Sequence, residues 1–125
     1  MNLSIKRLII FYLTFTATLA HAETMCLIGD CKNGVAYQVK DAPFFQTEAW
    51  YVGDFRDGKK SGCASISTGR VKYFGQVLEG SKHGEGIEVD TQKMTTRIGT
   101  WKNNRFVEAR DSLDRDKLCG SIEFP

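Results

Sequence analysis

The chain has 125 residues, of which 42% are hydrophobic, and it carries 17 lysines and arginines against 15 aspartates and glutamates. Residues 1–22 contain two of the basic residues and no acid, so removing them leaves 103 residues with 15 basic and 15 acidic side chains. We therefore expect one small domain and no nucleic-acid partner, since a nucleic-acid binder needs an excess of positive charge.

The segment 1–22 has the three parts of a Sec signal peptide. A basic pair at positions 6 and 7 precedes an apolar run over 8–19, and small alanines follow at 20 and 22. The run is shorter than the ~20 apolar residues that a spanning helix needs. We predict cleavage after Ala22 and a periplasmic or secreted protein.

Four cysteines follow, the first two within a lead-in segment, 23–50. An even number of cysteines in an exported chain predicts disulfides. Of the three possible pairings we favour Cys26 with Cys31, a tight local loop, and Cys63 with Cys119, which ties the tail to the middle of the chain. A zinc site is the alternative, but the chain has no CxxC pair, and we expect no metal or cofactor.

Two further features of the lead-in segment are open to interpretation. Lipidation at Cys26 is an alternative to soluble export, although residues 23–25 lack the small residues of a lipoprotein site. Residues 41–49 form an insertion with two adjacent aromatic rings, Phe44 and Phe45. Exposed, this pair would contact a partner; otherwise one ring folds over the rest of the domain.

Residues 51–106 repeat a glycine-rich pattern. Tyr-Val-Gly-Asp-Phe at 51–55, with glycines at 58 and 62, recurs 22 residues later as Tyr-Phe-Gly-Gln-Val at 73–77. A third copy starts at 97 with Asn104 at the turn position, where asparagine tolerates a left-handed backbone. A degraded copy is visible at 27–31.

Each copy predicts one β-hairpin. In a strand Tyr51, Gly53 and Phe55 share one face, so the glycine leaves room between two rings. The polar stretch 58–62 predicts a turn and 64–67 a return strand. Because successive hairpins add edge to edge, we predict an all-β fold, a single-layer antiparallel β-meander.

The pattern Y-x-G-x-[F/W]-x-x-G-x-x-x-G-x-G resembles the MORN (membrane occupation and recognition nexus) repeat. The resemblance covers about residues 26–106 and is strongest over 51–86, while Ala36 and Ala64 replace its last glycine. The lead-in at 26–34 is similar to that of exported bacterial MORN proteins. The resemblance implies a rod-like or curved sheet used for protein association, in some members for lipid contact, and does not imply catalysis.

The tail, 107–125, is predicted to cap the sheet. Acids at its start, a lysine near its end and Gly120 after it favour a short helix over 111–118. We expect this helix, or a loop, to cover an open sheet edge that would otherwise pair with other chains.

Two groups of residues are candidate binding sites. The first is an aromatic row on one face, which forms either an open groove for a protein partner or simply the core. The second is a row of basic turn residues along one edge, which meets an anionic lipid or acidic glycan or is merely solvated. The aromatic row is Tyr51, Phe55, Tyr73 and Trp101; the basic edge is Lys59, Lys60, Lys82, His83 and Arg105.

We expect that the protein is not an enzyme, since its sequence contains no Gly-x-Ser-x-Gly motif and no other recognisable activated nucleophile. His83 is interpreted as an ordinary exposed turn histidine. The leading hypothesis is an exported, disulfide-stabilised binding module that engages a protein through its aromatic face. Exposed sheet edges would allow oligomers to form by strand pairing.

Overall fold

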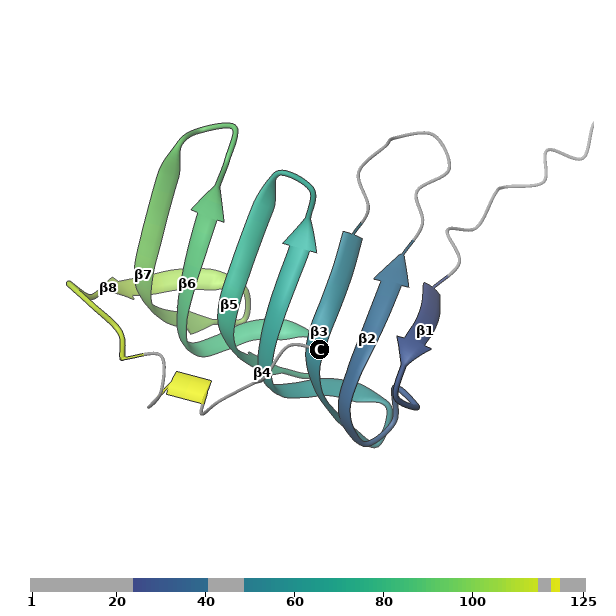
Figure 1. Cartoon of the computed structure of the whole chain (residues 1–125). Helices are drawn as coiled ribbons and strands as arrows, with labels where there is room; N and C mark the ends of the chain where they lie inside the picture. The colour runs from purple at the N-terminus through teal and green to yellow at the C-terminus, as the bar shows by residue number, and fades with distance from the viewer. Residues whose placement is uncertain (1–23, 41–48, 115–117, 120–125) are drawn as a thin grey trace, which may run out of the picture.

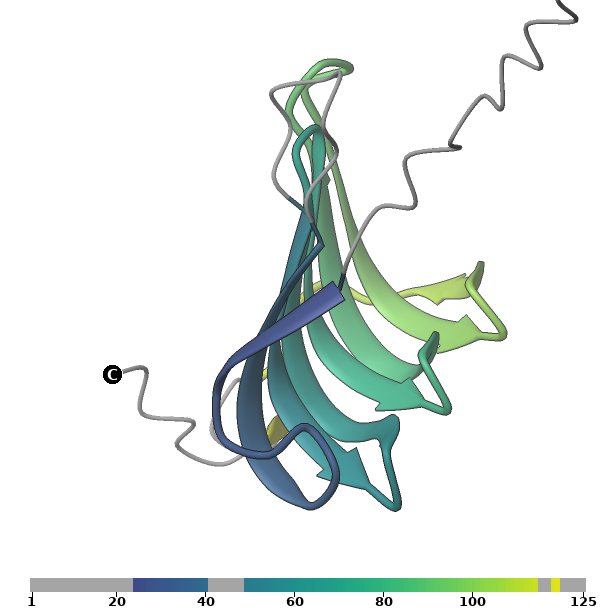
Figure 2. The same ribbon diagram turned by 90° about the vertical axis from the view of Figure 1, so that its right-hand side faces the viewer.

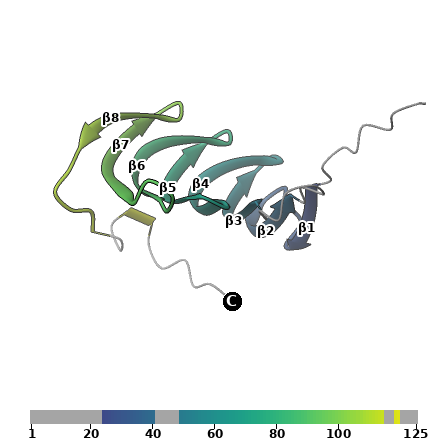
Figure 3. The same ribbon diagram turned by 90° about the horizontal axis from the view of Figure 1, so that it is seen from above.

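The computed structural model describes residues 24–40, 49–114 and 118–119. Its strands form one antiparallel sheet in which each strand pairs with the next along the chain, as Figures 1 and 3 show. The predicted single-layer meander is confirmed. Residues 1–22, Phe44 and Phe45 lie outside the described residues. The strands are β1 (Thr24–Ile28), β2 (Gly34–Lys40), β3 (Ala49–Arg56), β4 (Lys59–Thr68), β5 (Val71–Leu78), β6 (Ser81–Asp90), β7 (Thr95–Lys102) and β8 (Arg105–Ala109).

Tight turns join the two strands of each repeat. Asp57 and Gly58 have φ angles of 49° and 75°, and Asn103 and Asn104 have 49° and 66°. Two successive positive φ angles define the hairpin turn whose twist matches that of the strands. Asn104 thus replaces glycine as predicted, but the predicted turn over 58–62 is too long, because β4 already begins at Lys59.

The first two repeats each contain a bulge at the same position. The pairing of β3 with β4 passes from Gly53↔Ala64 to Phe55↔Lys60, so Asp54 alone faces residues 61–63. Its Oδ2 accepts a hydrogen bond from the Cys63 N–H at 2.9 Å. Gln76, 22 residues later, accepts in the same way from the Glu85 N–H at 2.9 Å. Bulges bend strands, and here they give the sheet a concave and a convex face (Figure 2).

The core lies on the concave face. The rings of Tyr51 and Phe55 pack edge to face across Gly53 with centroids 5.1 Å apart. A Cβ on Gly53 would lie 2.4 Å from the Cys63 carbonyl oxygen, so no larger residue fits there. Tyr73 and Trp101 pack in the same way, at 5.7 Å. The two rings therefore meet across the glycine as predicted, and the space at the glycine itself is closed by residues of β4.

Both favoured disulfides, Cys26–Cys31 and Cys63–Cys119, are present. Residues 107–109 of the predicted tail belong to β8. The second disulfide joins the end of the tail to β4, an interior strand, so the described residues after β8 do not cap a sheet edge as expected. Leu113 and Leu118 instead lie with Gln76 on the convex face, where Leu118 is buried.

The predicted tail helix is described only in part. The Leu118 N–H donates to the Asp114 carbonyl at 2.8 Å, and Leu118 and Cys119 have helical backbone, while 115–117 lie outside the described residues. No helix in the described part of the chain has the length and apolar character needed to cross a membrane.

Candidate binding face

The four predicted aromatic residues are core residues in the structure. Each is only 2% exposed: Tyr51, Phe55, Tyr73 and Trp101. Their polar atoms are also satisfied, since the Tyr51 hydroxyl donates to the Asp54 carbonyl at 2.8 Å and the Tyr73 hydroxyl to the Gln76 carbonyl at 2.8 Å. Burial raises the pKa of both tyrosines. The prediction of an open aromatic groove is therefore wrong, and the four rings form a packed row instead. The reason is that the bend in each hairpin brings its turn end over the rings.

Cationic side chains cover this packed row. The Lys60 Nζ lies 4.7 Å from the Tyr51 ring centroid, and the Lys82 Nζ lies 4.9 Å from that of Trp101. The Arg97 guanidinium is 5.2 Å from the Trp101 ring. Such cations are attracted to the ring faces and cover them with their methylene stems. A partner on the concave face would therefore meet cations, with the rings beneath them.

Two of these cations, Lys82 of the second repeat and Arg97 of the third, are neutralised by Glu88. Its carboxylate is 4% exposed and accepts hydrogen bonds from Lys82 and from Arg97, with the Arg97 Nε at 3.1 Å. Burial alone would raise the pKa of Glu88, but these hydrogen bonds and charges outweigh it and lower the pKa below the ordinary value of 4.5. The second repeat is thus a closed charge cluster.

Glu88→Gln is expected to lower the free energy of unfolding at pH 7 by about 1–2 kcal/mol, less than for a fully buried pair because Arg97 is half exposed. Since the folded pKa is depressed, the stabilisation is present above the unfolded pKa near 4.5 and is lost as the pH falls through the folded pKa. Urea unfolding between pH 7 and pH 3 should show a smaller acid loss in the variant. Glu79→Gln, which breaks an exposed pair, is the control, and equal effects of the two would contradict this role.

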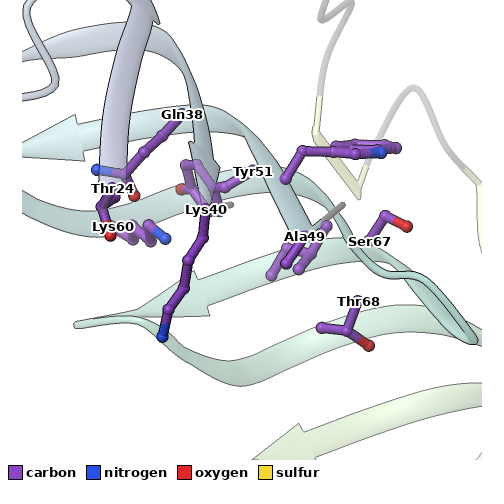
Figure 4. Close-up of a pocket in the computed structure, with 10 residues that line it drawn as sticks. Thr24, Gln38, Lys40, Ala49, Tyr51, Lys60, Ser67 and Thr68 are labelled. Atoms are coloured by element: carbon purple, nitrogen blue, oxygen red, sulfur yellow. The ribbon is translucent and has the colours of Figure 1, made fainter. Parts of the chain in front are cut away.

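The first repeat keeps an open pocket at the corresponding place, on the concave face. This cavity of about 290 Å³ contains two lysines, Lys40 and Lys60, and no acidic side chain of the described residues lines it (Figure 4). Burial, and then the positive charge of Lys40, lower the pKa of Lys60. Its lining is Thr24, Gln38, Lys40, Ala49, Trp50, Tyr51, Lys60, Ile66, Ser67 and Thr68.

The predicted basic edge is divided between different environments. Lys59 pairs with Glu79 at 2.9 Å, both largely exposed, whereas Lys60 and Lys82 lie on the concave face. Arg105 follows the last turn and is exposed. The prediction of one continuous basic edge is thus wrong. The lysines lie at the beginning of strands and not in the turns, so their side chains alternate between the two faces of the sheet.

His83 is also placed differently from the prediction. It lies within β6, half buried, and faces a cavity of about 450 Å³ together with Asp54 and Gln76. Its Nδ1 is buried and has no hydrogen-bond partner within the described part of the chain. The prediction of an exposed histidine in a turn is therefore wrong. Among the described residues, no group of three or more His, Cys, Asp or Glu side chains is placed to hold a metal.

Sequence reasoning missed four residues of the concave face: Lys40, Ile66, Glu88 and Arg97. A usable signal was the 22-residue offset itself. When this offset is applied to the other residues of the repeat, it aligns Lys60 with Lys82 and Ile66 with Glu88. The second alignment marks the one concave position at which the first repeat has an apolar residue and the second has an acid.

Comparison with known protein families matches the MORN repeat at residues 51–65 and 73–92. A search of curated proteins finds no match. The matched segments cover β3 with the first half of β4, and then β5 with β6. They are the two hairpins that contain the bulges at Asp54 and Gln76 and the buried Tyr51 and Tyr73.

Proposed function

We propose that this MORN-repeat protein is an exported, non-catalytic binding or scaffold module. It engages a protein partner with the concave face of its sheet. The repeat suggests a binding or scaffold role. The two disulfides are consistent with an oxidising compartment, and the leader over 1–22 supports export.

One observation carries the choice of face. The described tail residues after β8 lie against the convex face, around Gln76 and Glu85, so they leave the concave face uncovered. That face is hollowed by the bend of the sheet and contains the pocket between Lys40 and Lys60. A concave surface with a few polar groups over an apolar floor is the usual form of a binding site.

Neighbouring threonines at the start of β7 provide a matched test of the face. Thr95 shares the concave face with Arg97, whereas Thr96 points to the convex side, and both are exposed. We expect a photo-crosslinking amino acid at Thr95, but not at Thr96, to give a discrete protein adduct in the host's envelope or culture fluid. Equal adducts from both positions, or an adduct from Thr96 alone, would rule out the concave face.

The alternative, an anionic lipid or acidic glycan at the lysine edge, has less support, because Glu79 already neutralises Lys59 and Glu88 neutralises Lys82. Vesicles with and without anionic lipid separate the two proposals. Binding that needs anionic lipid and falls steeply with salt would favour the alternative.

A further inference from the structure

The repeat brings two unlike residues to one position on the concave face. Tyr51 pairs with Ile66 across β3 and β4, and Tyr73 pairs with Glu88 across β5 and β6. The lysine over each tyrosine ring is also equivalent, with Nζ 4.7 Å from the Tyr51 centroid and 5.3 Å from that of Tyr73. The two sites therefore share their ring and their lysine, and differ in the carboxylate.

Among the described residues, this difference leaves the positive charge of the first site without a carboxylate partner. Lys82 has the buried Glu88 carboxylate, whereas Lys60 has Ile66 at that position and makes no ion pair with a described residue. A second cation, Lys40, lines the same pocket. Glu79 lines a separate, neighbouring cavity on the turn side of Lys60, and its carboxylate bonds Lys59 at 2.9 Å.

We propose that the pocket between Lys40 and Lys60 binds a carboxylate side chain of a protein partner, in the place that Glu88 fills one repeat later. This inference rests on the proposed function and adds the chemistry of the partner, an acidic segment. The fold itself supplies the precedent, since Glu88, opposite Tyr73 on the paired strand, shows that a carboxylate fits between a second cation and the lysine that covers the tyrosine ring.

The rest of the lining suits such a group. Gln38 and Thr68 supply polar atoms at the rim, and Ile66 supplies an apolar surface for the methylenes of an incoming Glu. Because the pocket is partly desolvated, a charge-assisted hydrogen bond to Lys60 is stronger there than on an open surface. A bound carboxylate would also raise the lowered pKa of Lys60 toward its ordinary value.

The test is an NMR titration of the oxidised protein, labelled at the lysine side chains, with a hexaglutamate peptide. We expect saturable shifts at Lys40 and Lys60, little change at Lys82, and no response to hexaglutamine. Ile66→Glu, which supplies the missing carboxylate from within, should weaken hexaglutamate binding by about tenfold or more and leave the melting temperature unchanged or raised. Thr96→Glu changes the net charge equally on the convex face and should bind as the parent does.

Four results would overturn the proposal. They are equal shifts at Lys82 and Lys60, full binding by Ile66→Glu, tighter binding of inorganic phosphate than of hexaglutamate, and tighter peptide binding by the Asp41→Asn/Glu48→Gln variant. The last would mean that an acid of the chain itself fills the pocket. A Thr95 crosslink that persists in Ile66→Glu would leave the proposed function standing without this pocket, whereas its absence from the parent protein would remove both.

Discussion

Trp101→Ala is expected to lower the free energy of unfolding by about 3–5 kcal/mol, the usual loss for a large buried aromatic ring. The ring is 2% exposed, packs against Tyr73 and Phe106, and donates from Nε1 to the Gly86 carbonyl at 3.3 Å. It also lies beneath two cations, so its removal opens the concave face to water. Domains of this size are stable by only about 5–15 kcal/mol.

Urea unfolding of the oxidised protein, followed by circular dichroism, measures this loss. Val107→Ala is the matched control, because Val107 is 56% exposed on the neighbouring strand and should change stability by less than about 0.5 kcal/mol. An unshifted urea midpoint for Trp101→Ala would contradict a core role for the aromatic row. The same burial makes Tyr73 and Trp101 unsuitable as surface probes, since their variants would lose binding through unfolding.

The hairpin repeat could be predicted because its determinants are local. The alternation of Tyr51, Gly53 and Phe55 sets the face of the rings, and a residue that tolerates positive φ sets each turn, including Asn104. The two disulfides were also predictable from an even number of cysteines after a predicted signal peptide, and the favoured pairing is confirmed.

The exposure of the rings could not be predicted, because it depends on the bulge. The bulge forms when the Asp54 side chain reaches a backbone N–H nine residues away, and no local propensity reports that contact. The bulge then bends β4 until Lys60, paired with Phe55, lies over Tyr51. A prediction from the strand pattern that does not include this bend places the rings in contact with solvent and the lysines at the edge of the sheet.

The side of the sheet that the tail covers was likewise beyond local patterns. A terminal segment would most simply protect the strand beside it, which is β8. The Cys63–Cys119 bond instead draws the tail to the middle of the sheet, where Leu118 is buried. This non-local covalent link thereby leaves the opposite, concave face free of the described tail.

Cys63→Ser/Cys119→Ser is expected to lower the free energy of unfolding by roughly 4 kcal/mol. The bond closes a loop with a sequence separation of 56, and its removal restores that loop's entropy to the unfolded chain. Cys26→Ser/Cys31→Ser opens a loop with a separation of only 5, for which the same relation gives about 2 kcal/mol. Urea midpoints of the parent and the two double variants should therefore fall in that order.

The long-range bond should matter for stability and not for the binding face. At a temperature where both proteins are folded, the Thr95 crosslink should survive in Cys63→Ser/Cys119→Ser, because Cys63 and the tail lie on the convex side. Equal losses of stability in the two disulfide variants would argue against the loop-entropy account. A crosslink lost from the still folded variant would mean that the tail shapes the concave face from behind, through the bulge at Asp54 that accepts the Cys63 N–H.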